Sequence, residues 1–215
     1  MRLFLIRHGQ SLANTVMNDI PDSALTAYGV NQAVITAHYL SQIAFDHILA
    51  SPLIRCLATA ERLADKLDLP IQVWADLVEV RTEGRYIGPP RSELMQQFPR
   101  VQLPDTCSED GWIYSGGEED AESFVRAQRV IQRLREEFAD KTCAVFAHGT
   151  FNSFLIQVAL GLNGETPMRF RQSNCCINVL DLEDDWTGIS VINSRCHLPE
   201  AAFGLPGWMK DHLSD

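Results

Sequence analysis

Two histidine–glycine pairs, His8-Gly9 and His148-Gly149, each follow a short apolar run of the sequence. Arg7 directly precedes the first pair. A third apolar run ends at Ser51-Pro52, and Arg55 follows shortly after it. Histidine serves as a nucleophile or base near neutral pH, and arginine binds phosphate oxygens through paired N–H groups. Like charges crowd together stably when an anion lies between them. If these residues converge, they predict a phosphate site that contains a histidine.

The apolar runs are predicted to be buried strands at 3–6, 46–50 and 142–147. The first ends directly before Arg7 and the third directly before His148, while the second ends at Ser51-Pro52, where a helix begins that carries Arg55 in its first turn. In an open α/β sheet, ligands bind beyond the carboxyl ends of the strands. Three strand ends would therefore deliver two histidines and two arginines to the same edge of one sheet.

The remaining elements follow from periodicity, capping residues and prolines. Thr26 is a candidate N-cap for a helix that runs to about Leu40. Further helices are predicted at 11–17, 52–67, 92–98, 119–138 and 151–160, and further strands at 71–74, 176–182 and 189–193. Strands that alternate with helices predict an α/β fold, a three-layer α/β/α sandwich with a mainly parallel central sheet.

The length of 215 residues fits a single domain over 1–215 with a lid-like insertion at about 80–118. That segment holds four of the ten prolines and is predicted to be largely irregular. Long irregular loops in compact domains are usually functional. Its four arginines suit an acidic second group on a ligand, or are surface cations: Arg81, Arg85, Arg91 and Arg100.

Composition narrows the class of protein. A formal net charge of −10 argues against a general nucleic-acid binder or a binder of anionic membranes. The sequence shows neither a signal peptide nor an apolar stretch of transmembrane length. The six cysteines form no C-x-x-C pair, which favours free thiols in a cytoplasmic protein over disulfides or a zinc site. No oligomeric state is indicated.

Taken together, the motifs resemble the histidine phosphatase superfamily, in its phosphoglycerate-mutase-like branch (branch 1). The matching stretches span nearly the whole chain: Arg7-His8-Gly9-Gln10-Ser11-x-x-Asn14, Leu25-Thr26-x-x-Gly29-x-x-Gln32-Ala33, Ser51-Pro52-Leu53-x-Arg55-x-x-x-Thr59-Ala60, Leu77-x-Glu79, Gly116-Gly117-Glu118, Ala147-His148-Gly149 and Asn193-x-x-x-His197-Leu198.

The resemblance implies a metal-independent phosphatase that needs no cofactor and hydrolyses a small phosphorylated metabolite through a phosphohistidine. His8 would be the nucleophile, and Glu79 would protonate the leaving oxygen and then activate water. The phosphoryl oxygens would be bound by the other predicted site residues: Arg7, Gly9, Asn14, Arg55 and His148. Neutral His8 would donate from its second ring nitrogen to a carbonyl or a similar acceptor.

Other interpretations stay open at this point. Arg55 could be a surface cation, and His148 a core histidine with satisfied hydrogen bonds. Asp76, Glu83 and Glu118 compete with Glu79 for the role of acid. The alternatives for the whole chain are a phosphoglycerate-type mutase and a regulatory domain with a phosphate pocket but little turnover. The mutase pattern Asn-Glu-Arg-x-Tyr-Gly is not found after Glu79, which favours hydrolysis.

Overall fold

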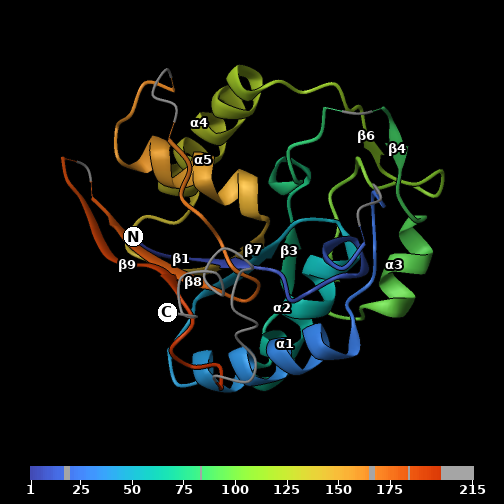
Figure 1. Ribbon diagram of the computed structural model, residues 1–215. Helices are drawn as coiled ribbons and strands as arrows, with labels where there is room; N and C mark the ends of the chain where they lie inside the picture. The colour runs from blue at the N-terminus through green and yellow to red at the C-terminus, as the bar shows by residue number, and fades with distance from the viewer. Residues whose placement is uncertain (17–19, 83, 165–167, 184, 200–215) are drawn as a thin grey trace, which may run out of the picture.

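The computed structural model describes residues 1–16, 20–82, 84–164, 168–183 and 185–199 (Figure 1). A seven-stranded sheet forms its centre. In spatial order, its strands are β5 (Val101–Gln102), β3 (Ile71–Val73), β2 (His47–Ala50), β7 (Thr142–Ala147), β1 (Arg2–Arg7), β8 (Ile177–Leu182) and β9 (Thr187–Ser194). The strands from β5 to β1 run parallel, and β8 is antiparallel to both β1 and β9. The sheet is therefore mainly parallel, as predicted.

Helices cover both faces of this sheet (Figure 1). The helices α1 (Ala27–Leu40) and α2 (Ile54–Leu67) pack on one face, and α4 (Asp120–Glu137) and α5 (Gly149–Ala159) pack on the other. Successive residues of β1 alternate between the two cores, with Phe4 and Ile6 in one and Leu3 and Leu5 in the other. The three-layer sandwich is confirmed, and the continuous apolar runs reflect burial on both faces.

The helices predicted at 11–17 and 151–160 differ from the structure. The helix expected at 11–17 is a 3₁₀ turn, Leu12–Asn14, because the Asn14 side chain accepts a hydrogen bond from the Ser11 N–H and closes a capping turn; residue 17 lies outside the described residues. α5 begins at Gly149, two residues before the predicted start. By contrast, Thr26 caps α1 as predicted and accepts from the Gly29 N–H.

The segment 80–118 is more ordered than its composition predicts. It contains the helix α3 (Arg91–Gln97) and a small antiparallel sheet of β4 (Tyr86–Ile87) and β6 (Ile113–Tyr114). It also supplies β5, which pairs with β3 at the edge of the central sheet. Part of this segment therefore belongs to the main sheet rather than to an insertion.

Two of its four arginines hold this segment together. Arg91 donates to the carbonyls of Leu103, Pro104 and Cys107. Arg100 forms ion pairs with Asp65 and Asp68, at the end of α2. These two cations stabilise loops, so they are not available for a ligand.

All six cysteines are free thiols, and five of them are buried, with Cys196 exposed. Among the described residues, no helix is both long and apolar enough to cross a membrane.

Candidate active site

The ends of three neighbouring strands bring the predicted residues together. Arg7 at the end of β1 lies opposite Ala147 at the end of β7, so His8 and His148 follow at the same level of the sheet. Their rings lie edge to face with centroids 5.3 Å apart. β2 lies on the other side of β7, and α2 begins shortly after it and carries Arg55. The predicted convergence at one sheet edge is confirmed.

His8 is buried, and its two ring nitrogens have different partners. Nδ1 lies 2.7 Å from the Gly9 carbonyl oxygen, which can only accept, so Nδ1 carries the proton. Nε2 therefore holds the lone pair and accepts from Arg55 Nε at 3.2 Å. Burial, then Arg55 and Arg7, lowers the pKa of His8 well below its usual value. The imidazole is neutral, and its Nε2 lone pair faces the Arg55 guanidinium.

Both arginines keep N–H groups for an anion. Arg7 donates from Nη1 to the Gln172 carbonyl at 2.6 Å, while its Nε is buried with no partner among the described residues. Arg55 donates to the Pro21 carbonyl, and its ion pair with Asp22 is long, at 4.0 Å. Burial lowers the pKa of Arg7 as well, which reflects the cost of a desolvated cation. A bound phosphoryl dianion would offset that cost.

Two predicted phosphate ligands have other partners in the structure. His148 is fully buried, does not line the cavity, and has its Nε2 2.9 Å from the Ser51 hydroxyl. The Gly9 N–H donates to Thr59 Oγ1, which corrects the expectation that it is free for phosphate. Gly9 is required for another reason, since a Cβ there would lie 2.5 Å from the Gly29 carbonyl oxygen. The absence of a side chain lets α1 approach the end of β1.

Asn14 lines the cavity beside Arg7 and His8. Its Oδ1 accepts from the Ser11 N–H at 3.0 Å and from Asn174 Nδ2 at 3.0 Å. Asn174 is a residue that the sequence did not single out, because it lies in a loop without a recognisable motif.

Glu79 is the one acidic side chain among the described residues that line the cavity. Its carboxylate accepts from the backbone N–H groups of Val80, Thr150 and Phe151 at 2.9–3.2 Å. It therefore caps α5, whose N-cap residue makes no side-chain cap of its own, and this explains the early start of that helix.

The competing acids lie elsewhere. Glu118 forms a two-bond ion pair with Arg126, and Asp76 does not line the cavity. Glu83 falls outside the described residues.

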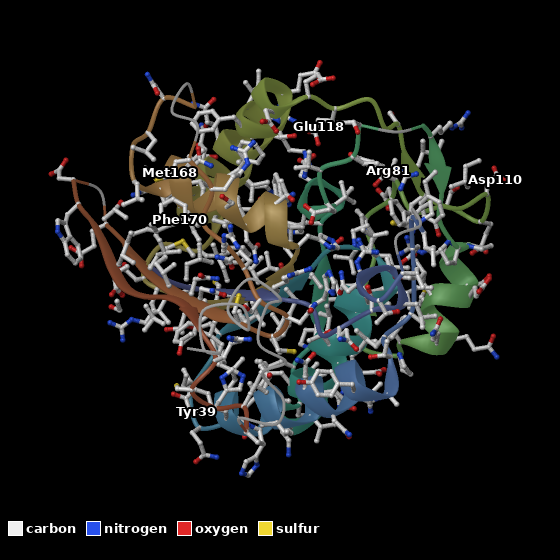
Figure 2. The ribbon with its side chains drawn as sticks, viewed as in Figure 1. Tyr39, Arg81, Asp110, Glu118, Met168 and Phe170 are labelled. Carbon is white, nitrogen blue, oxygen red and sulfur yellow. The ribbon has the colours of Figure 1, made fainter. Side chains whose placement is uncertain are left out.

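The cavity, of about 190 Å³, is closed on its other side by the segment 80–118. Tyr86, Trp112 and Tyr114 line it, with Tyr86 edge-on to Trp112 at 5.6 Å. Of the segment's four arginines, Arg81 alone lines the cavity, and Figure 2 shows it beside the β4–β6 sheet. This wall combines aromatic surface with one cation.

Asp22 joins the two walls. Its carboxylate accepts from the Ile54 N–H at 2.8 Å, at the start of α2, and from the Tyr86 hydroxyl at 3.3 Å. Burial raises the pKa of Asp22 to about 6. Asp22 belongs to none of the motifs found in the sequence, so this connection was not predicted.

Asn193 and His197 have structural contacts. The Asn193 side chain accepts from the Ser173 N–H, and His197 lies 2.9 Å from Thr36 Oγ1 and stacks on Tyr39. They support the loop before β8 and the outer face of α1 rather than the cavity.

Comparison with known proteins decides the family. The family model of the histidine phosphatase superfamily (branch 1) matches residues 3–195. The chain belongs to this superfamily. Among its curated relatives, the adenosylcobalamin/alpha-ribazole phosphatase of Escherichia coli (strain K12) is 30% identical over 91% of this chain and 97% of its own. Phosphoserine phosphatase 1 of Hydrogenobacter thermophilus is 26% identical over 93% and 95%.

Solved structures agree on the fold of this histidine phosphatase. The crystal structure of the alpha-ribazole phosphatase from Shigella flexneri matches with a TM-score of 0.67 and 27% identity, and covers 90% of this chain and 96% of that one. The resemblance expected from the motifs is confirmed over nearly the whole chain.

Proposed function

We propose that this protein is a metal-independent phosphomonoesterase that works through a phosphohistidine at His8. The observation that carries the proposal is the orientation of His8. Its Nδ1 proton is fixed on the Gly9 carbonyl, and its Nε2 lone pair faces Arg55. His8, Arg7 and Arg55 all line the cavity. A neutral imidazole held in this way is a competent nucleophile toward phosphorus.

In the first step, His8 Nε2 attacks the phosphorus atom while the ester P–O bond breaks. Arg7, Arg55 and the Asn14 amide bind the equatorial oxygens and stabilise the charge that develops there. Arg55 must leave the His8 lone pair for this step, and the phosphoryl oxygens provide the acceptors that replace it. His148 supports the His8 ring from the side of β7 and reaches the phosphoryl group only if it gives up its contact with Ser51.

Glu79 completes the reaction. As an acid, it gives its proton to the leaving oxygen; as a carboxylate, it then takes a proton from the water that attacks the phosphohistidine. The P–N bond breaks, inorganic phosphate leaves, and neutral His8 is restored. Supporting this role, Glu79 lines the cavity next to Arg7 and His8.

Hydrolysis is favoured over a mutase reaction. A mutase must retain a bisphosphorylated intermediate, which requires dedicated anion contacts from the segment 80–118. Arg91 and Arg100 are engaged in loop contacts, and Arg81 is the one arginine of that segment at the cavity. The presence of Glu79 at the cavity likewise favours an enzyme that turns over its ligand over a domain that only binds it.

We take 80–118 to be the lid of a single domain and the substrate to be a small phosphate ester in the cytoplasm.

The deciding experiment is phosphate release from an aryl phosphate in the presence of EDTA, by the wild type and by His8→Ala. We expect turnover by the wild type and a loss of more than about 10³-fold in the variant. In the wild type alone, a denaturing quench at alkaline pH, where the P–N bond of phosphohistidine is stable, should trap a phosphoenzyme. Equal rates in the two proteins would overturn the mechanism.

A further inference from the structure

The loop Gln172–Cys175, which precedes β8, contacts Arg7 and His8 at the end of β1. The Gln172 carbonyl accepts from Arg7 Nη1, and the Cys175 N–H lies 3.1 and 3.2 Å from the carbonyls of Arg7 and His8. Asn174 Nδ2 donates to the His8 carbonyl at 3.1 Å and to Asn14 Oδ1 at 3.0 Å. This loop therefore holds the Arg7 side chain and the backbone of Arg7 and His8, although none of its residues lines the cavity.

The contact between Asn174 and Asn14 fixes how Asn14 faces the cavity. Asn14 Oδ1 accepts from two N–H donors, the Ser11 backbone and Asn174 Nδ2. If the Asn14 amide turned over, its NH₂ group would face these donors and both hydrogen bonds would be lost. The observed orientation leaves the Asn14 NH₂ group as the donor available to the cavity.

The loop itself is rigidly held. The side chains of Gln172 and Asn178 form a reciprocal pair of buried amide hydrogen bonds, at 2.6 and 3.0 Å. Asn178 also donates to the Leu5 carbonyl in β1, and the Ser173 N–H donates to Asn193. Cys175 has a left-handed backbone (φ 53°), which a residue other than glycine adopts only when its surroundings impose it.

We infer that Asn174 is a positioning residue of the phosphate site: it sets the Asn14 amide so that its NH₂ group faces the phosphoryl oxygens. The inference rests on the proposed function, because it assigns Asn14 to the phosphoryl group. The hairpin of β8 and β9 supplies no residue to the cavity lining. It affects the orientation of Asn14 indirectly, because it anchors the loop that carries Asn174.

A double-mutant cycle tests this with orthovanadate as the probe, measured by calorimetry so that binding is separate from turnover. We expect Asn14→Ala to weaken vanadate binding about tenfold and Asn174→Ala to weaken it about three- to tenfold. The double variant should bind within about twofold of Asn14→Ala, because Asn174 acts through Asn14. Asn174→Asp, which sets an oxygen against Asn14 Oδ1, should weaken binding more than Asn174→Ala.

Asn31→Ala, on the exposed side of α1, is the matched control and should leave both vanadate binding and the melting temperature unchanged. Unchanged binding in Asn174→Ala and Asn174→Asp, or losses that multiply in the double variant, would overturn the inference. Both results leave the proposed function standing if His8→Ala still abolishes hydrolysis. A wild type that neither binds vanadate nor releases phosphate would overturn the two together.

Discussion

The two walls of the cavity are built in opposite ways. The phosphate wall carries Arg7 and His8 at the end of β1 and Arg55 at the start of α2, which follows β2. Both strands lie beside β7 at the centre of a sheet covered on both faces. The opposite wall comes from two-residue strands and loops of the segment 80–118. The first wall contributes cations and a histidine, and the second contributes mainly aromatic rings.

This difference separates chemistry from specificity. The buried strand ends fix His8 and Arg7 to the rigid core, which suits groups that must meet a phosphorus atom precisely. The aromatic wall faces the rest of the ester, and its residues lie on a small sheet that can vary without disturbing the central one. Changes in the first wall should therefore alter every substrate equally, and changes in the second should depend on the leaving group.

After the loss of His8 itself, the largest effect is expected for Arg55→Ala, which removes a cation from the phosphate wall. The rate of hydrolysis should fall about 10²–10³-fold for every phosphate ester, because the charge on the transferring oxygens loses a donor. The measurement is kcat/KM across a panel of esters. Arg100→Ala, which removes a cation of the loop ion pairs, is the control and should retain activity. A loss confined to some esters would contradict the assignment of Arg55 to the phosphoryl group.

Glu79→Gln tests whether Glu79 protonates the leaving oxygen, where the phosphoryl group meets the rest of the ester. The kcat/KM of alkyl phosphates should fall about 10²-fold, since their leaving oxygen needs a proton, while the kcat/KM of aryl phosphates should fall less than about tenfold. This constant reports the step that releases the alcohol or phenol, before the hydrolysis of the phosphohistidine that all esters share. The substitution would also weaken the cap of α5, because an amide offers one acceptor oxygen where the carboxylate offers two. The ratio of the two rates within this one variant is therefore the informative quantity. An unchanged ratio would assign the proton to another group.

The strand ends could be predicted because an abrupt change from apolar residues to Arg-His-Gly has one physical meaning in a buried strand. The partners of these residues could not. Asp22, Gln172 and Asn174 act through hydrogen bonds that form only when segments distant in the sequence meet. The strands β4 and β6 are too short for any periodicity to mark them.

The direction of the His148 side chain could not be predicted from the sequence either. Its placement at a strand end could be read from the sequence, but its contact with Ser51 depends on how β2 packs beside β7. The same is true of Gly9, whose close approach to Gly29 depends on the docking of α1.

Asp22→Asn tests the link that Asp22 makes between the two walls, through the pH dependence of the stability of the protein. The folded-state pKa of Asp22 is raised to about 6, above its value in the unfolded chain, so the folded protein holds this proton more tightly. Ionisation of Asp22 therefore lowers stability as pH rises from about 4 to 6. The amide of the variant cannot ionise, so the variant should gain about 1–2 kcal/mol relative to the wild type between pH 4 and pH 7. Urea unfolding at both pH values measures this, and a difference independent of pH would contradict it.

The smallest effect is expected for Tyr114→Ala in the aromatic wall. The Tyr114 ring lines the cavity, and its hydroxyl makes a long contact, 3.4 Å, with the Arg81 carbonyl. Loss of the ring should raise KM about two- to fivefold for aryl phosphates and leave kcat nearly unchanged, because the contact stabilises the ground state and the transition state alike.

Tyr114→Phe keeps the ring and should behave as the wild type, and Tyr39→Ala, on α1 away from the cavity (Figure 2), should change neither constant. If Tyr114→Ala instead lowers kcat for every ester, then the aromatic wall also positions the phosphoryl group. The separation between a chemical wall and a specificity wall would then be wrong at this residue.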